Sequence, residues 1–218
     1  GTYLIEFCQD SQDIISKAPI RPVKSSIESI YNVLVYGLSE YVEKNGFNGG
    51  LIGLSGGIDS ALVLVLAVDA LGADRVHAVM MPSKYTSDMS LEDARQLAAN
   101  LGVSYSVIEI DSLVNAFENS LQSLFESTQK DTTEENIQAR IRGVLLMSLS
   151  NKFGQMVIST GNKSEMAVGY ATLYGDMAGG FAPLKDVPKT LVYKLSRYRN
   201  SLAKVIPSRI IDRPPSAE

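Results

Sequence analysis

Apolar positions along this chain follow two spacings, one typical of helices and one typical of buried strands. In residues 25–44 they recur at steps of three and four, which indicates a helix with one buried face. Asn45 and Gly46 end this pattern, as expected just beyond a helix. Further helical patterns cover residues 61–71 and about 189–202.

Four short apolar runs are typical of buried strands, at residues 51–54, 75–81, 103–110 and 155–159. Stretches with helical spacing separate the first three runs, so strands and helices alternate. This alternation predicts a parallel sheet with right-handed crossovers. The expected fold class is therefore α/β, with an open, Rossmann-like parallel sheet that carries helices on both faces.

A long helix is expected between the third and fourth runs. It should begin near residues 132–135, where a threonine hydroxyl can cap it and two glutamates suit its positive end, and it should continue through Leu149. The chain then becomes glycine-rich from Thr160 to Gly180. Residues 1–24 show no sustained period and are interpreted as a linker or a lone edge strand, so one domain covers residues 25–218.

The composition is consistent with one hydrophobic core, and the net charge argues against nucleic-acid and membrane partners. The chain has 218 residues, 45% of them hydrophobic, and a net charge of −4, which gives no electrostatic footprint for nucleic acid or an anionic membrane. No apolar run approaches the roughly 20 residues that span a bilayer. The single cysteine, Cys8, cannot form an intramolecular disulfide, which favours a reducing compartment and hence the cytoplasm.

The strongest candidate for a binding or catalytic site is the loop that joins the apolar run at residues 51–54 to the helix after it. Two adjacent glycines allow backbone N–H groups to turn inward around an anion, and we expect Gly57 to need a positive φ that a β-branched residue resists. Ser55 and Ser60 add hydroxyl donors, and the helix directs its positive end at the same place. This pattern predicts a pyrophosphate cradle made of Gly53, Leu54, Ser55, Gly56, Gly57, Ile58, Asp59 and Ser60.

Asp59 distinguishes this loop from a Walker loop, which has a lysine before its last hydroxyl residue. A carboxylate beside phosphates would repel them unless a divalent cation lay between, and oxygen ligands are typical of Mg²⁺. The structural alternative is a simple glycine turn in which Asp59 begins a helix.

The loop at residues 55–60 resembles the SGGxDS loop of N-type ATP pyrophosphatases, which adenylate an acceptor and release pyrophosphate. Several ligase families share this loop, so it indicates the activation chemistry rather than the acceptor. Residues 159–176, together with 136–142 and 183–190, resemble NAD⁺ synthetases and are closest to their bacterial glutamine-dependent forms. The resemblance covers residues 25–218 and implies the fold of adenine-nucleotide α-hydrolases.

The resemblance implies ligands for two residues near the fourth run. Thr160 ends that run at its carboxyl end, where a parallel sheet gathers its ligands, and by resemblance it contacts ATP. Glu165 follows on what we interpret as a glycine-containing turn, and by resemblance it lies at the metal and at deamido-NAD⁺. The metal ligands would be Asp59 and Glu165, although a solvated loop acid is the structural alternative for Glu165.

Three further residues gain roles in the same way. Lys189 matches a lysine that contacts the ATP phosphates, with a solvated lysine at a helix start as the alternative. Asn136 and Arg140 lie four apart on one helix face, which the resemblance places against deamido-NAD⁺ near a dimer contact; an exposed polar face is the alternative. Leu173 stands where ammonia-dependent relatives carry a substrate-binding lysine. His77 is expected to be a packed core or strand-end histidine rather than a catalyst.

The activity implied by the resemblance is ATP-dependent amidation of deamido-NAD⁺ to NAD⁺, with Mg²⁺, ATP as co-substrate and ammonia as nucleophile. The helix at residues 133–149, with Ile141, Val144, Leu145 and Leu149, is expected to form a homodimer contact. Glutamine-dependent relatives also carry an amidase domain. We expect this chain to be the synthetase part alone, with its C-terminal tail missing. Two alternatives stay open: the same loop serving another acceptor, and a nucleotide-binding regulatory module.

Overall fold

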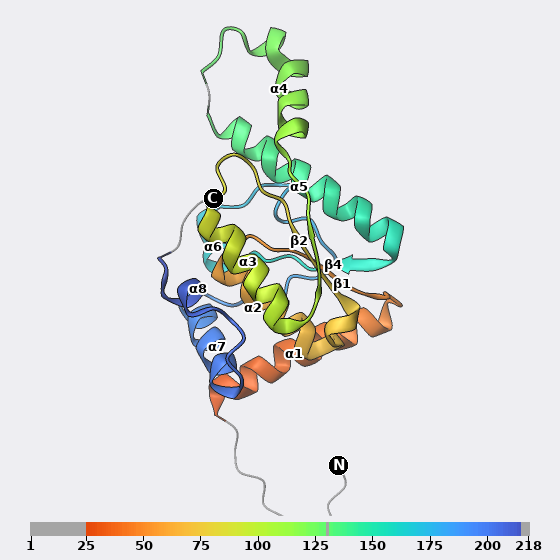
Figure 1. The fold of residues 1–218 in the computed structure, drawn as a ribbon, viewed down its shortest axis with the longest axis vertical. Helices are drawn as coiled ribbons and strands as arrows, with labels where there is room; N and C mark the ends of the chain where they lie inside the picture. Colours follow the sequence, from red (N-terminus) through yellow and green to blue (C-terminus); the bar gives the residue numbers. More distant parts are fainter. Residues whose placement is uncertain (1–24, 130, 215–218) are drawn as a thin grey trace, which may run out of the picture.

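The computed structural model describes residues 25–129 and 131–214 (Figure 1). The linker or edge strand expected at residues 1–24, with Cys8, and the last residues, 215–218, lie outside this range. Four strands form one parallel sheet in the order β3-β2-β1-β4, which confirms the expected α/β class. Their bounds are Gly49–Gly53 for β1, Val76–Met80 for β2, Ser104–Val107 for β3 and Gln155–Val157 for β4.

Side chains alternate along the strands, so each face of the sheet has its own apolar core. Ile52, Ala78 and Met156 belong to one core, whereas Leu51 and Val157 belong to the other. The strands are shorter than the apolar runs in the sequence. The run at residues 103–110, for example, contains strand β3 only to Val107; beyond it Ile108 N–H donates to Met80 O and Ile110 N–H to Pro82 O, and Ile110 is buried in the second core.

Five helices and one 3₁₀ turn cover the first face. Helix α2 packs between the sheet and its neighbours, which explains why apolar residues occupy nearly its whole surface. Helix α1 is amphipathic, as predicted, and begins at a cap in which Ser25 Oγ accepts the Glu28 N–H. The bounds are Ser26–Lys44 for α1, Ile58–Leu71 for α2, Ala73–Arg75 for η1, Asp88–Leu101 for α3, Lys189–Leu202 for α7 and Ser208–Asp212 for α8.

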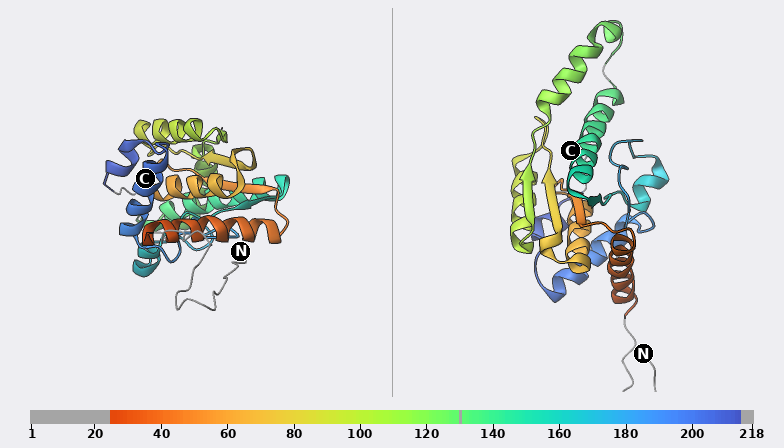
Figure 2. Two further views of the ribbon diagram at one scale, coloured as in Figure 1. Left: turned by 90° about the horizontal axis from the view of Figure 1, so that it is seen from below. Right: turned by 90° about the vertical axis from the view of Figure 1, so that its right-hand side faces the viewer.

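Helices α4 (Asp111–Phe125) and α5 (Thr132–Phe153) contribute to the core on the second face, so helices lie on both faces of the sheet as expected. The expected threonine cap of α5 is wrong, because the Asp131 side chain accepts the Thr133 N–H and forms a capping box with Glu134. The helix also passes Leu149 and ends at Gly154, whose φ of 67° suits glycine. Helix α4 extends away from the sheet in Figures 1 and 2.

The segment after β4 contains a short helix, α6 (Lys163–Val168), where the sequence suggested a glycine-containing turn. That interpretation overlooked Asn162, which caps the helix from inside the protein. The glycine-rich segment then returns along β4, where Phe181 bridges to Ile158, and leads into α7. Among the residues that the structure describes, no helix is long and apolar enough to cross a membrane.

Candidate active site

The predicted phosphate loop lies at the carboxyl end of β1 and leads into the first turn of α2. Two hydroxyls hold its shape: Ser60 Oγ accepts the Ser55 N–H at 3.2 Å and donates to Gly57 O at 3.1 Å, and it lies 3.0 Å from Ser55 Oγ. Ser55 Oγ in turn accepts the Gly57 N–H at 3.2 Å. Ser60 is buried and its hydroxyl holds the loop in shape, whereas Ser55 is exposed.

The positive φ expected at Gly57 is found instead at Gly56, and the sequence expectation is wrong by one residue. Gly56 has φ of 79°, and a Cβ there would lie 2.5 Å from Ser90 O on the first turn of α3. Gly57 is the extended N-cap of α2, with φ of −88°. Gly56 therefore combines a positive φ with a close approach to α3, and both require glycine.

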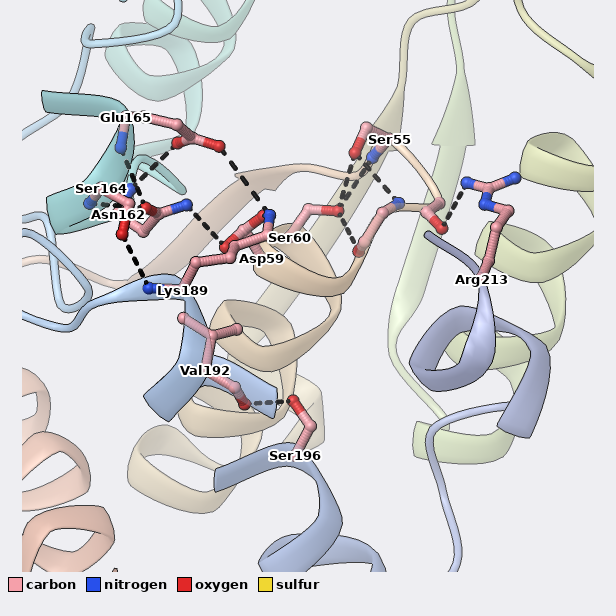
Figure 3. Close-up of polar contacts among 12 residues, drawn as sticks. Ser55, Asp59, Ser60, Asn162, Ser164, Glu165, Lys189, Val192, Ser196 and Arg213 are labelled. Carbon is pink, nitrogen blue, oxygen red and sulfur yellow. Dashed lines mark hydrogen bonds and ion pairs between the residues drawn. The ribbon is translucent and has the colours of Figure 1, made fainter. Parts of the chain in front are cut away.

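Three charged side chains meet beside the loop (Figure 3). Asp59, in the first turn of α2, pairs with Lys189 Nζ from the first residue of α7. Lys189 Nζ also lies 3.9 Å from Glu165 Oε1. The structure therefore brings together Asp59, Glu165 and Lys189 from three segments that are far apart in the sequence, as predicted.

Asn162 links these groups, although no role in the site is predicted for it from the sequence. Its side chain is fully buried and donates from Nδ2 to Asp59 Oδ1 at 3.0 Å. Its Oδ1 accepts the N–H groups of Ser164 and Glu165, and Glu165 Oε2 accepts the Asn162 N–H at 3.1 Å. This capping box fixes Glu165 relative to Asp59. The Asn-x-x-Glu spacing at residues 162–165 was the signal that could have revealed it.

Electrostatics at this cluster favour an additional cation. Burial raises the pKa of Glu165, and the nearby Asp59 carboxylate raises it further, against the lowering effects of the Asn162 N–H and Lys189. Two half-buried carboxylates thus share one lysine. No group of three or more His, Cys, Asp or Glu side chains converges within residues 25–129 and 131–214, so a metal here would take its remaining ligands from water or phosphate, as Mg²⁺ commonly does.

Thr160 lies at the same edge of the sheet, three residues beyond β4 and two before Asn162. It is half-buried. The neighbouring Ser159 Oγ donates to Asp176 O at 3.2 Å, which anchors the glycine-rich segment to this edge. Thr160 therefore follows its predicted strand.

Asn136 and Arg140 form a second cluster, on one face of α5 as predicted. Asn136 Oδ1 accepts from Thr172 Oγ1 at 2.8 Å, and Arg140 Nε donates to Leu173 O at 3.2 Å. The two residues hold the glycine-rich segment against α5. Close packing continues at Gly143, where a Cβ would lie 3.1 Å from the carbonyl oxygens of the segment. The polar face is thus partly occupied by the protein's own chain.

The predicted self-contact face of α5 is only partly available. Ile141 is buried in the core, and Leu145 and Leu149 pack against that core. Val144 is 63% exposed. His77 is half-buried within β2 and pairs with Ser106 Oγ at 2.9 Å, in agreement with a packed strand histidine.

The chain is similar to known proteins in its sequence and in its structure. The family model described as NAD synthase matches residues 30–218. The glutamine-dependent NAD(+) synthetase of Acinetobacter baylyi is 58% identical over 199 residues, which cover 90% of this chain and 37% of that protein.

Among solved structures, the glutamine-dependent NAD⁺ synthetase of Acinetobacter baumannii, in complex with adenosine diphosphate, is similar with a TM-score of 0.88 and 55% identity. The match covers 94% of this chain and 39% of that one. The NMN synthetase of Francisella tularensis is similar with a TM-score of 0.80 and 32% identity, over 88% of this chain and 76% of that one. The chain thus spans less than half the length of the glutamine-dependent relatives it matches.

Proposed function

Because the chain belongs to the NAD synthase family, we propose that it catalyses the ATP-dependent amidation of deamido-NAD⁺ to NAD⁺, with release of AMP and pyrophosphate. The observation that carries the proposal is the convergence of Asp59, Glu165 and Lys189 beside a glycine loop at a helix N-terminus. In such a site the Lys189 ammonium and the backbone N–H groups of the loop can both contact a triphosphate.

ATP would lie with its phosphates on the loop. The loop hydroxyls bond within the loop, and Ser55 Oγ accepts the Gly57 N–H. The backbone N–H groups of residues 56–58 would donate to the phosphates, with phosphate oxygen replacing Ser55 Oγ as the acceptor of the Gly57 N–H. The complex of the Acinetobacter baumannii relative with adenosine diphosphate supports an adenine nucleotide here. We propose the following ATP-binding set: Gly53, Leu54, Ser55, Gly56, Gly57, Ile58, Asp59, Ser60, Thr160 and Lys189.

Asp59 and Glu165 would hold Mg²⁺, because their two carboxylates lie beside the loop and share one lysine. Bound Mg²⁺ would neutralise charge on the phosphates that leave as pyrophosphate. Lys189 pairs with Asp59, and a metal held by Asp59 would free the Lys189 ammonium for the phosphates.

The acceptor is the nicotinate carboxylate of deamido-NAD⁺. Its oxygen attacks the α-phosphorus of ATP, pyrophosphate leaves, and ammonia then attacks the adenylated carboxyl carbon and displaces AMP. No covalent enzyme intermediate is required, so the residues act by positioning and by charge. We propose that deamido-NAD⁺ contacts Asn136, Arg140 and Glu165; the first two also fix the segment at residues 172–173 that would border this substrate.

The homodimer and the nitrogen source belong to the same proposal. We propose that α5 joins two copies through its exposed residues, including Val144. The relatives that this chain matches are named glutamine-dependent, and more than half of their length lies beyond the match. We propose that an amidase domain in that part supplies ammonia. The cytoplasm is the proposed location.

The test is an assay of this chain with ATP, Mg²⁺ and ammonium, using deamido-NAD⁺ in one arm and nicotinate mononucleotide in the other. The second acceptor is included because of the likeness to an NMN synthetase. We expect NAD⁺ formation in the first arm to dominate.

Asp59→Asn should reduce pyrophosphate release on the order of 10²-fold or more, since it removes a metal ligand. Nucleotide binding without turnover of either acceptor would favour a regulatory module.

A further inference from the structure

Two arginines fasten α8 to α3. Arg209 donates from Nε to both carboxylate oxygens of the buried Asp93, at 2.9 and 3.0 Å. Arg213, four residues later, donates from Nη1 to Oγ of the buried Ser90 at 3.1 Å. Ser90 and Asp93 are three apart on α3, so the two arginines follow one face of that helix.

Arg213 also reaches the phosphate loop. Its Nη2 lies 3.4 Å from Gly56 O, and its guanidinium therefore bridges α3 and the loop. The bridge is at the place of closest packing, because Gly56 has no room for a Cβ beside Ser90. Figure 3 shows Arg213 on the opposite side of the loop from Asn162 and Glu165.

The contact between Arg213 and Gly56 O also determines the direction in which the Gly57 N–H points. In a trans peptide the carbonyl oxygen and the following N–H point in opposite directions. When Gly56 O points toward Arg213, the Gly57 N–H must point away from it, to the side where Ser55 Oγ accepts it. That N–H is one of the donors which the proposed function assigns to the phosphates.

We propose that Arg213 is a positioning residue of the nucleotide site. It fixes the peptide between Gly56 and Gly57 so that the Gly57 N–H points to the side of Ser55 Oγ, where pyrophosphate would replace that hydroxyl as its acceptor. Its positive charge behind the carbonyl also makes this peptide a stronger donor, because polarised hydrogen bonds in a chain strengthen one another. The inference rests on the proposed function, since it concerns the same site.

A purely structural role for Arg213 is the competing explanation, and Arg209 provides the control for it. Both arginines tie α8 to α3, but of the two only Arg213 is bonded to the loop among the contacts of the described residues. The variants are Arg213→Ala, Arg213→Lys and Arg209→Lys. Each is titrated by calorimetry with Mg-ATP and, separately, with AMP, and thermal unfolding is followed without nucleotide.

We expect Arg213→Ala to weaken Mg-ATP binding about tenfold, the effect of one hydrogen bond to a charged group, while AMP binding is unchanged because AMP lacks the pyrophosphate. Arg213→Lys should not restore the affinity, since an ammonium cannot span two acceptors as a planar fork does. Arg209→Lys should bind Mg-ATP as the wild type does, whatever its thermal stability.

Three results would overturn the inference: wild-type Mg-ATP affinity in Arg213→Ala, an equal loss of affinity in Arg209→Lys and Arg213→Lys, or a parallel loss of AMP binding. If Arg213→Ala does not fold, Arg213→Lys is judged by the same criteria. Failure of the wild-type chain to bind Mg-ATP would instead contradict the proposed function.

Discussion

Asp59 receives two different donors, an ammonium from Lys189 and an amide from Asn162. The ammonium can leave for phosphate, because its flexible stem allows it to reorient. The amide cannot, because the cap that it forms on α6 fixes the whole Asn162 side chain. Asn162 is therefore the group that keeps the orientation of Asp59 when Lys189 moves.

Substitutions of Asn162 can separate its two roles, which are to cap α6 and to donate to Asp59. Serine at this position can still cap α6 but is too short to reach Asp59, whereas alanine can do neither. We expect Asn162→Ser to be about 1 kcal/mol more stable than Asn162→Ala, the usual value of an N-cap. Turnover should fall about tenfold in both, since both lose the hydrogen bond to a charged group. Urea unfolding and the rate of pyrophosphate release measure the two effects, and wild-type turnover in Asn162→Ser would contradict the positioning role.

His77 should affect acid stability and not catalysis. Burial lowers its pKa below the ordinary value of about 6.5, so the unfolded chain takes up a proton more readily than the folded one. Stability should therefore decrease as pH falls through about 6.5 toward the lowered pKa. Urea unfolding at pH 7 and pH 5 should show a smaller loss in His77→Gln than in the wild type. Its turnover at pH 7.5 should be normal, and a large decrease would show that His77 has a catalytic role.

At the scale of elements, the conformation of the phosphate loop depends on α3, which packs against the loop but contributes no residue to it. Gly56 contacts the first turn of α3, and Arg213 joins the two from behind. The conformation of the loop is thus set jointly by the glycine and by the surface against which it packs.

Alanine at the two glycines should give very different results. Gly56→Ala introduces a Cβ 2.5 Å from Ser90 O in a backbone with positive φ, so the loop must shift and ATP binding should be lost. Gly57→Ala meets only Ser55 Oγ, at 3.3 Å, with an ordinary φ, and should weaken binding by less than about tenfold. Calorimetry with Mg-ATP gives both values. Equal losses would mean that the contact with α3 does not govern the loop.

The sequence predicted those features that depend on neighbouring residues. Strand and helix alternation, the loop at residues 53–60 and the start of α7 at Lys189 are local patterns, and all are found. Two errors, the cap of α5 and the helix at Asn162, concern local caps whose spacing is visible in the sequence. The other features that the sequence does not show are contacts between distant segments: the approach of Ser90 to Gly56, which decides where the positive φ lies, and the bond from Asn162 to Asp59, 103 residues away.

For the whole molecule, α4 and α5 carry exposed apolar residues that lie away from the loop. Val144 is 63% exposed on α5, and Phe117 and Leu124 are 51% and 74% exposed on α4. Both helices lie on the same side of the sheet. Exposed apolar residues on adjacent helices are typical of a contact with another protein surface.

Light scattering should give twice the chain mass at micromolar concentration for the wild type. Val144→Glu should shift the mass toward one chain, because a charge in an apolar contact is costly to bury. Val33→Glu is the matched control: Val33 is 67% exposed, but it lies on α1, across the sheet. A dimer that tolerates Val144→Glu and is lost in Val33→Glu would place the contact on the other face.

The sparse anchoring of α4 has a consequence for the order in which the molecule opens. All of α4 is described, and Val114 is its one buried residue, whereas α2 buries ten. Local opening of α4 should therefore need far less free energy than global unfolding. Its amide hydrogens should exchange with deuterium long before those of α2. If α4 lies in the dimer contact, its exchange should become slower as the protein concentration rises, while exchange in α2 stays the same.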